Sequence, residues 1–461
     1  MIPKGEYQGI WWLPEKDDDK FTGTLKIDLD NKITLSIIGL LKGNLTEEEI
    51  PIMCGQIIGT KYIVLQHCNW IGSTYGSGLS GERFSARILF LGSEKISSIK
   101  FNKIRFSINV LTPWMADNTS KIYDKAECDG KKCKQLQLFD SDEIKIELAE
   151  AEITIYSYWN IIGKEYHNVY SCERQTLVEV SMSKMLALNE LFDTFVLPFC
   201  RLLCFLTQQS AFVTDIMGIN KGIGPDYWID ITYENIVRDQ EYDERKILAS
   251  FFYMNENFSD IIKNWFKLYS ELKFIYIYFF ALYNTYYLEE KFNNIVNVLE
   301  AYHRCRFDNV VQKQNVFDDR IETILSSAPS EERQWLKEKL KFANEPNLRK
   351  RLTELFEKIS INIQPVIDGY MSGIIKDSNK KKTNSFIQLI VSTRNRMVHK
   401  DKENDERVLK NGEEMYFAVD ILIIAFEIFT LRELKFSDKK IGEVMNQNLR
   451  YKQILLLKNK V

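Results

Sequence analysis

The chain has 461 residues, enough for about two or three domains of ordinary size. Hydrophobic residues make up 45% of it and charged residues 27%, which is typical of a folded globular protein and excludes a largely disordered one. The formal net charge of -3 and a pI near 6.0 exclude a globally basic nucleic-acid coat protein. Any polyanion must therefore bind to a local basic patch.

The N-terminal segment, residues 1–14, lacks the basic start and the apolar core of a secretory signal. The most apolar stretches, residues 274–287 and 421–429, are shorter than the roughly 20 residues that a membrane span requires. We therefore expect a cytoplasmic protein with no membrane partner.

Cys128 and Cys133, in CDGKKC, are the one tight pair among eight scattered cysteines. They could belong to a zinc site, but no second pair or nearby histidine completes it. We favour a polar hairpin tip for this segment, and we predict no metal site and no cofactor.

The first half of the chain is rich in short alternating runs bounded by Gly, Asn, Asp or Ser. This pattern is typical of antiparallel strands in a sandwich or barrel-like fold. The runs are residues 23–30, 32–39, 61–68, 83–92, 103–110, 143–159, 175–182, 210–217 and 226–233. A helical segment near 184–207 interrupts them, and Pro198 marks a kink or break in it.

After about residue 245 the strand pattern disappears and helical periodicity takes over. The helical stretches are residues 260–307, 329–343, 346–360, 383–399 and 412–434. The sequence therefore predicts an α+β protein with a β-rich N-terminal region, residues 1–245, followed by an all-α bundle, residues 246–461.

Residues 394–399 read RNRMVH near the end of one predicted helix. We expect this helix to end close to His399, because residues 400–407 have no apolar face to bury. Asn395 lies one turn before His399 and shares its face, whereas Arg394 and His399 are about 140° apart on a straight helix. A histidine at a helix C-terminus is well placed as a general acid or base, although the spacing alone favours a surface histidine.

The chain resembles the ApeA family of bacterial anti-phage proteins, whose C-terminal half is a HEPN domain. HEPN domains carry an RxxxxH motif with a polar residue after the arginine, which here is Arg394, Asn395 and His399. Residues 294–307 and 346–357 also resemble ApeA-type HEPN sequence. At the other end, GIWWLP followed by FTGTLKIDL resembles the start of the ApeA N-terminal domain.

The resemblance implies a metal-independent endoribonuclease that acts as a homodimer in anti-phage (abortive infection) defence. His399 would move the proton, Arg394 would stabilise charge on the phosphate, and Asn395 would orient either group. The partners would be an RNA substrate, such as tRNA or another structured RNA, and a phage-derived trigger. The β-rich region would sense infection or restrain the nuclease.

Further residues are candidates for substrate binding. Glu300 and His303 could face the active cleft, or form a buried pair, or lie on the surface. The basic run Lys380, Lys381 and Lys382 could hold distant phosphates, although a solvated loop is the default for such a run. We interpret Arg349, Lys350 and Arg351 as the wet face of a helix, and Trp11, Trp12 and Trp114 as core residues.

A second hypothesis of a different class stays open. In it the protein is a non-catalytic RNA- or protein-binding dimer, the HEPN bundle is only a scaffold, and the β-rich region is the working part. The complete set of Arg394, Asn395 and His399 favours the nuclease.

Overall fold

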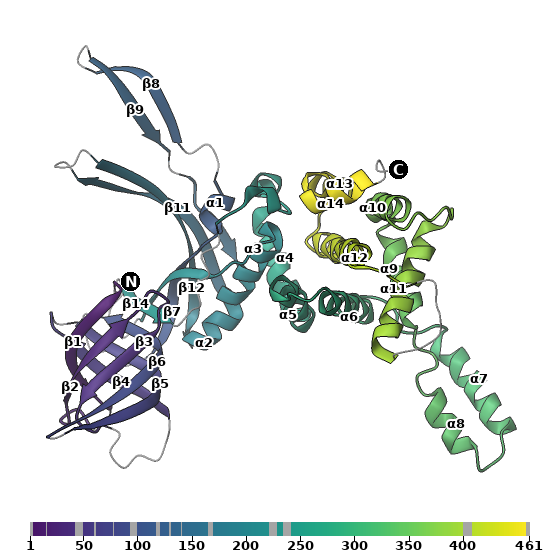
Figure 1. Cartoon of the computed structure of the whole chain (residues 1–461), viewed down its shortest axis with the longest axis horizontal. Coiled ribbons are helices and arrows are strands. Elements are labelled where there is room, and N and C mark those ends of the chain that lie inside the picture. The colour runs from purple at the N-terminus through teal and green to yellow at the C-terminus, as the bar shows by residue number, and fades with distance from the viewer. Residues whose placement is uncertain are drawn as a thin grey trace. The chain divides into compact units, whose positions relative to one another are not determined.

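The computed structural model of the chain describes residues 3–457, apart from residues 15, 42–48, 60, 77, 93–98, 117–119, 129–130, 140, 165–168, 221–227, 234–240 and 400–407. The chain divides into two compact units, Met1–Glu244 and Arg245–Val461. Strands dominate the first unit and helices make up the second (Figure 1). The predicted fold class, a β-rich region followed by an all-α bundle, is therefore confirmed.

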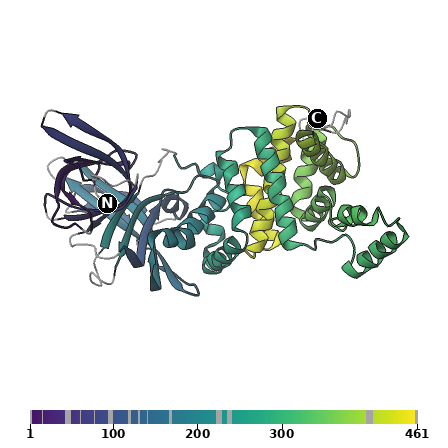
Figure 2. The ribbon, with the colours of Figure 1, turned by 90° about the horizontal axis from the view of Figure 1, so that it is seen from below.

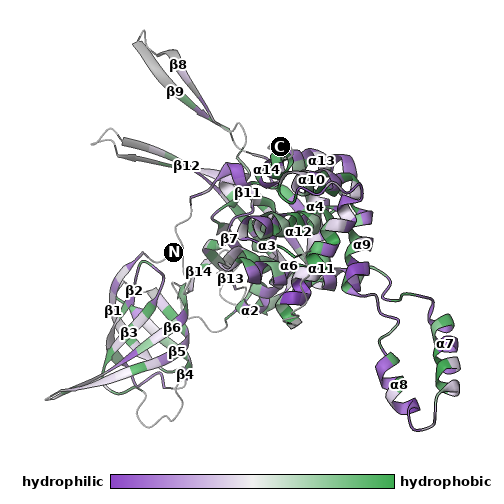
Figure 3. Cartoon of the chain, turned by 45° about the vertical axis from the view of Figure 1, so that its right-hand side comes forward, coloured by the Kyte–Doolittle hydropathy of each residue, from purple (hydrophilic) through white to green (hydrophobic). Residues whose placement is uncertain are grey.

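Six strands of the first unit form a closed antiparallel sheet. They are β1 (Gly5–Trp12), β2 (Phe21–Ile27), β3 (Ile33–Ile38), β4 (Glu49–Ile57), β5 (Lys61–Gly76) and β6 (Leu79–Gly92). Their order is β6-β3-β2-β1-β4-β5, and a further pairing of β5 with β6 closes the ring. Because alternate residues of a strand face opposite sides, hydrophobic and hydrophilic positions alternate along these strands (Figure 3). Of the two predicted folds, a sandwich and a barrel-like fold, this part of the chain has the barrel-like one.

The interior of the closed sheet is filled by large apolar side chains, among them Trp11, Leu65 and Phe84. Gly55 lies against the ring of Trp11, and a Cβ at this position would overlap the indole. Trp12 and Trp114 are buried as well. The prediction that these tryptophans belong to the core is confirmed.

The sheet continues beyond β6 as an open antiparallel layer. The further strands are, in order, β14 (Trp228–Tyr233), β13 (Val213–Ile219), β7 (Lys100–Ile108), β12 (Val169–Ala187), β11 (Ala151–Lys164) and β10 (Ile144–Glu147). The short helix α1 (Leu111–Trp114) follows β7. A separate hairpin is formed by β8 (Ser120–Cys128) and β9 (Lys131–Leu138). The CDGKKC segment thus lies where these two paired strands meet, as a hairpin requires, but residues 129–130 of the predicted tip and the side chains of both cysteines lie outside the described part.

The helical segment of the first unit begins later than residue 184. Strand β12 continues to Ala187, because Leu186 and Ala187 still pair with Phe101 and Lys100. Then follow α2 (Leu188–Leu191), a π-helical turn (Phe192–Val196) and α3 (Leu197–Thr207). Pro198 lies in the first turn of α3, directly after the π-helical turn, and since it has no N–H it cannot bond to the preceding helical turn, so it marks a change of helix type.

The second unit is a helical bundle. After three 3₁₀ turns (Glu244–Lys246, Phe251–Tyr253 and Asn255–Asn257), its helices are α4 (Phe258–Glu271), α5 (Lys273–Ala281), α6 (Leu288–Arg306), α7 (Gln314–Ser327), α8 (Arg333–Leu340), α9 (Leu348–Lys358), α10 (Ser360–Gly373), α11 (Lys382–His399), α12 (Gly412–Glu433), α13 (Asp438–Gln447) and α14 (Leu449–Leu456); another 3₁₀ turn (Leu282–Asn284) follows α5. Helices α7 and α8 pair with each other and stand apart from the remaining helices (Figure 1).

Helix α12 is the central helix of the bundle. It lies beside α6, as Figure 2 shows, and is buried on nearly all sides. The ring of Phe426 on α12 lies 4.6 Å from Phe279 and 5.6 Å from Tyr276, measured between ring centroids. No helix in the described ranges is long and apolar enough to cross a lipid bilayer.

Candidate active site

Helix α11 carries the Arg394, Asn395 and His399 motif at its C-terminal end. Its apolar face packs on α9 and α10, where the Phe386 ring lies 5.8 Å from Phe356 and 5.7 Å from Tyr370, measured between centroids. The described part of the helix extends to His399, and the predicted end of the helix adjoins residues 400–407, which lie outside the described part. The motif is therefore built on a helix anchored in the bundle at its other end.

Thr393 fixes the chain immediately before the motif. Its side chain is 4% exposed, and its hydroxyl donates a hydrogen bond to the carbonyl of Leu389 at 2.7 Å. The same hydroxyl accepts a hydrogen bond from the backbone N–H of Leu409 at 3.0 Å. Thr393 therefore ties the end of α11 to the segment that leads into α12, a role that helical spacing alone could not assign.

Arg394 and Asn395 are half-buried. Neither side chain forms a hydrogen bond or ion pair with another residue that the structure describes. The backbone of His399 is helical, and its side chain lies outside the described part. On this straight helix Arg394 and His399 are about 140° apart, whereas Asn395 and His399 share a face.

His303 lies in the interior of the bundle, with 0% of its surface exposed. Its Nδ1 accepts a hydrogen bond from Nη1 of Arg351 at 3.2 Å, since a guanidinium can only donate. Its Nε2 must then carry the proton and donate to Oε2 of Glu354, at 2.7 Å. Burial lowers the pKa of His303, although the hydrogen bond to Glu354 opposes this. Both ring nitrogens are occupied, so we assign His303 to the polar core between α6 and α9.

Arg351 is buried, contrary to the expectation that it belongs to the wet face of its helix. It is 1% exposed, because its side of α9 packs against α6. Its guanidinium donates a hydrogen bond to Asn309 and lies 3.6 Å from the carboxylate of Glu345. Glu300 lies 3.9 Å from Arg351 Nε and accepts a hydrogen bond from Arg304. Glu300 therefore balances charge beside Arg351.

The basic run Lys380, Lys381 and Lys382 lies at the N-terminal end of α11. Lys380 and Lys381 are exposed, whereas the ammonium of Lys382 donates a hydrogen bond to Ser372 on α10. The structure therefore leaves two of the three lysines directed to solvent, far along the helix from His399.

In the part of the chain that the structure describes, no group of three or more acidic, histidine or cysteine side chains is arranged to hold a metal ion.

Two family models match the chain. The model described as ApeA N-terminal domain 1 matches residues 6–265, and the model described as Apea-like HEPN matches residues 293–440. The chain belongs to the ApeA family. HEPN domains are generally ribonuclease domains, and the ApeA family consists of HEPN-domain defence effectors. No curated protein and no solved structure matches the chain.

The ApeA family models and the compact units divide the chain at different places. The N-terminal model extends to residue 265, inside α4, whereas the first compact unit ends at Glu244. The HEPN model begins in α6 and includes α11, so the complete RxxxxH motif lies within the matched region.

Proposed function

We propose that this protein is a metal-independent endoribonuclease effector of anti-phage (abortive infection) defence. The observation that carries the proposal is the occurrence of Arg394, Asn395 and His399 at the end of one helix within the HEPN match. Arg394 is half-buried and bonded to no other described residue, and a guanidinium can bind a phosphate through two parallel hydrogen bonds.

The substrate supplies its own nucleophile in this mechanism. The ribose 2′-OH attacks the adjacent phosphorus, a new O–P bond forms, and the bond from phosphorus to the 5′-oxygen breaks. His399 takes the proton from the 2′-OH or delivers one to the departing 5′-oxygen. The products are a 2′,3′-cyclic phosphate and a 5′-OH.

The protein stabilises the charge that develops on the phosphate. Arg394 presents a planar fork of donors that matches two phosphate oxygens. Asn395 shares the face of His399 and orients the imidazole or the phosphate. The negative end of the helix dipole at His399 favours the imidazolium form, which suits proton delivery.

Two copies of the chain complete the site. The angle of about 140° between Arg394 and His399 keeps them from converging on one phosphate within a single straight helix. A homodimer with the two motifs facing each other brings an arginine and a histidine to the same phosphate. The β-rich unit senses a phage-derived trigger or restrains the nuclease until the trigger arrives.

Sequencing of RNA ends tests the proposal directly. Cells expressing the wild type should accumulate 2′,3′-cyclic phosphate and 5′-OH ends during phage infection, and cells expressing His399→Ala or Arg394→Ala should not. A His399→Ala protein that folds, dimerises and protects as well as the wild type would rule out catalysis. The non-catalytic binding dimer would then take its place.

A further inference from the structure

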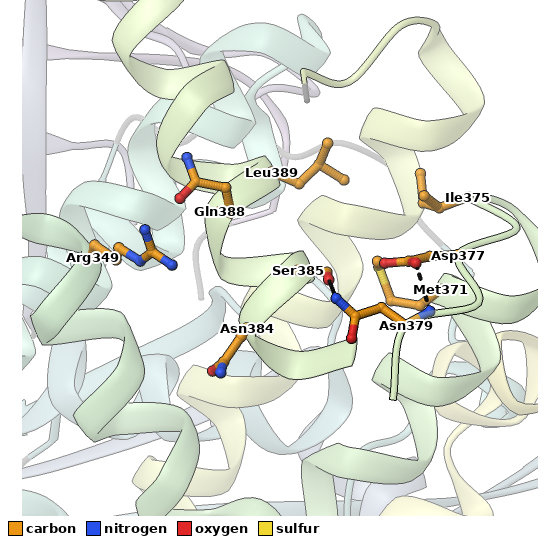
Figure 4. A pocket seen from close by; sticks show the side chains of 9 residues that line it. All are labelled: Arg349, Met371, Ile375, Asp377, Asn379, Asn384, Ser385, Gln388 and Leu389. Atoms are coloured by element: carbon orange, nitrogen blue, oxygen red, sulfur yellow. Dashed lines mark hydrogen bonds between the residues drawn. The ribbon is translucent and has the colours of Figure 1, made fainter. Parts of the chain in front are cut away.

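A groove crosses the N-terminal half of α11. It has a volume of about 400 Å³ and is lined by side chains of α9, α10, α11 and the loop between α10 and α11. Figure 4 shows these side chains, which are Arg349, Met371, Ile375, Asp377, Asn379, Asn384, Ser385, Gln388 and Leu389. The volume is at the lower end of the range for small-ligand sites, so the groove can hold one nucleotide-sized group.

One side of the groove is held in place by its own hydrogen bonds. Asn379 donates from Nδ2 to the Ser385 hydroxyl at 3.2 Å, and its Oδ1 accepts from the backbone N–H of Lys381 at 3.0 Å. The carboxylate of Asp377 accepts from the backbone N–H of Asn379 at 2.8 Å. These bonds fix the shape of this wall, which also carries the negative charge of the Asp377 carboxylate.

The other side presents polar groups with bonding capacity to spare. Among the described residues, the side chains of Arg349 and Asn384 have no hydrogen-bond partner. Gln388 donates one bond, from Nε2 to Ser392 at 2.9 Å, which leaves its carbonyl oxygen open. Figure 4 shows Arg349, Asn384 and Gln388 gathered on this side. Two amides and a guanidinium offer donors and acceptors for a base edge and a charge for a phosphate.

The groove shares a helix face with the motif. Gln388 precedes Asn395 by seven residues and His399 by eleven, so all three lie within about 20° of one direction around α11. At 1.5 Å per residue, Gln388 and His399 are about 16 Å apart along the axis. A single RNA strand spans that distance in a few nucleotides.

Three basic residues at the groove, against the one carboxylate of Asp377, favour a polyanion. Lys380 and Lys381 are exposed in the loop that forms one wall, and Arg349 is exposed at the opposite rim. Ile375, which is half-buried, adds apolar surface for the face of a base, beside the buried Met371 and Leu389. Single-stranded RNA exposes such base faces and edges, whereas a duplex hides them.

We propose that this groove binds one unpaired nucleobase of the RNA substrate, a few nucleotides from the scissile phosphate, with Asn384 and Gln388 reading its edge. The inference rests on the proposed function, since it assigns the RNA strand to the face of α11 that includes His399. It predicts that the cleavage site is selected by a base outside the cleaved dinucleotide.

Binding measurements on intact RNA test the groove apart from cleavage. The full chain carrying His399→Ala is titrated with a single-stranded RNA of about a dozen nucleotides, and each base is replaced in turn by an abasic residue. One position should show affinity weakened by about 3- to 10-fold, as expected for one or two lost hydrogen bonds. Adding Gln388→Ala or Asn384→Ala should abolish that penalty.

Gln447→Ala and Asn446→Ala, at exposed positions of α13, are matched controls and should preserve the penalty. A flat abasic scan, a penalty that survives Gln388→Ala and Asn384→Ala, or no RNA binding at all would overturn the inference. If free nucleoside monophosphates displace the RNA at concentrations below those at which the RNA itself binds, the groove is a site for a small nucleotide ligand. That result would also overturn the inference.

The ribonuclease proposal and the groove inference can be disproved independently of each other. If the wild type cleaves RNA while the abasic scan is flat, the ribonuclease function stands and the groove inference falls. If the scan shows the expected penalty while the wild type leaves every RNA intact, the groove inference stands and the ribonuclease function falls.

Discussion

The hydroxyl of Thr393 accepts a hydrogen bond from the backbone N–H of Leu409 at 3.0 Å. This bond joins the last turns of α11 to the segment that enters α12, one residue before Arg394. Both residues are buried, so neither group can turn to water instead. Thr393 is therefore a positioning residue for the motif.

Thr393→Val should remove this bond while keeping the volume of the side chain. The Leu409 N–H is then left buried and unpaired, which costs about 1–3 kcal/mol of unfolding free energy. RNA cleavage should fall by about ten- to a hundredfold through misplacement of the motif. Urea denaturation and cleavage assays measure the two effects. Thr393→Ser keeps the hydroxyl and should restore most of the activity; equal activity of both variants with the wild type would contradict the role.

Arg394→Lys should lose nearly as much cleavage as Arg394→Ala, about 10²–10³-fold. Lysine keeps the charge but loses the fork of donors that matches two phosphate oxygens. Asn395→Ala should be milder, at about tenfold, because one orienting hydrogen bond contributes less than charge stabilisation. Single-turnover cleavage rates check the order. Arg320→Ala, at an exposed position of α7, is the control and should cleave like the wild type. A fully active Arg394→Lys would contradict bidentate phosphate binding.

Cleavage should continue in EDTA. In the proposed mechanism the 2′-OH of the substrate is the nucleophile and Arg394 stabilises the phosphate charge, so no metal-bound water is needed. The measurement is the cleavage rate of an unstructured RNA with and without chelator, since magnesium also folds structured substrates. Complete loss in EDTA with recovery on adding a single divalent ion would rule out this mechanism.

The active protein should be a homodimer with two-fold symmetry. One helix separates Arg394 from His399 by about 140°, so the proposed mechanism requires two motifs to meet at one phosphate. Light scattering at micromolar concentration measures the mass. Mixing Arg394→Ala with His399→Ala chains should partly restore cleavage, because a mixed dimer keeps one arginine and one histidine across the cleft. A fully active preparation that contains only monomer would contradict the prediction.

Stability should fall as the pH drops below about 6.5, the ordinary pKa of histidine. Burial lowers the pKa of His303 in the folded protein, and Arg351 occupies the nitrogen that would be protonated. The unfolded chain then binds more protons in this pH range, so the free energy of unfolding decreases as the pH falls. His303→Gln should flatten this dependence in urea titrations, whereas His67→Asn, at a histidine of the other unit, should retain it. An unchanged slope in His303→Gln would contradict the assignment.

The sequence by itself determined the fold class and the helix on which the Arg394, Asn395 and His399 motif lies. Alternating runs in the first half and helical periodicity in the second are local signals, and they need no knowledge of distant contacts. Strands β1 and β4 were not predicted. Gly5 and Gly9 weaken the alternating pattern of β1, and Pro51 and Gly55 weaken the alternating pattern of β4. Those strands exist because the ring of six closes around a shared core.

Tertiary structure alone decided which polar residues are buried and which are open to a substrate. Arg351 was expected on the wet face of its helix and His303 was assigned no single environment, yet they meet between α6 and α9 because partners 48 residues apart satisfy one another. Tertiary packing likewise determines the hydrogen bond of Thr393 and the groove at Asn384 and Gln388, whose walls come from three helices and a loop. Helical spacing fixes the face on which a side chain lies, but only the packing of other elements against that face determines whether it becomes core, anchor or binding surface.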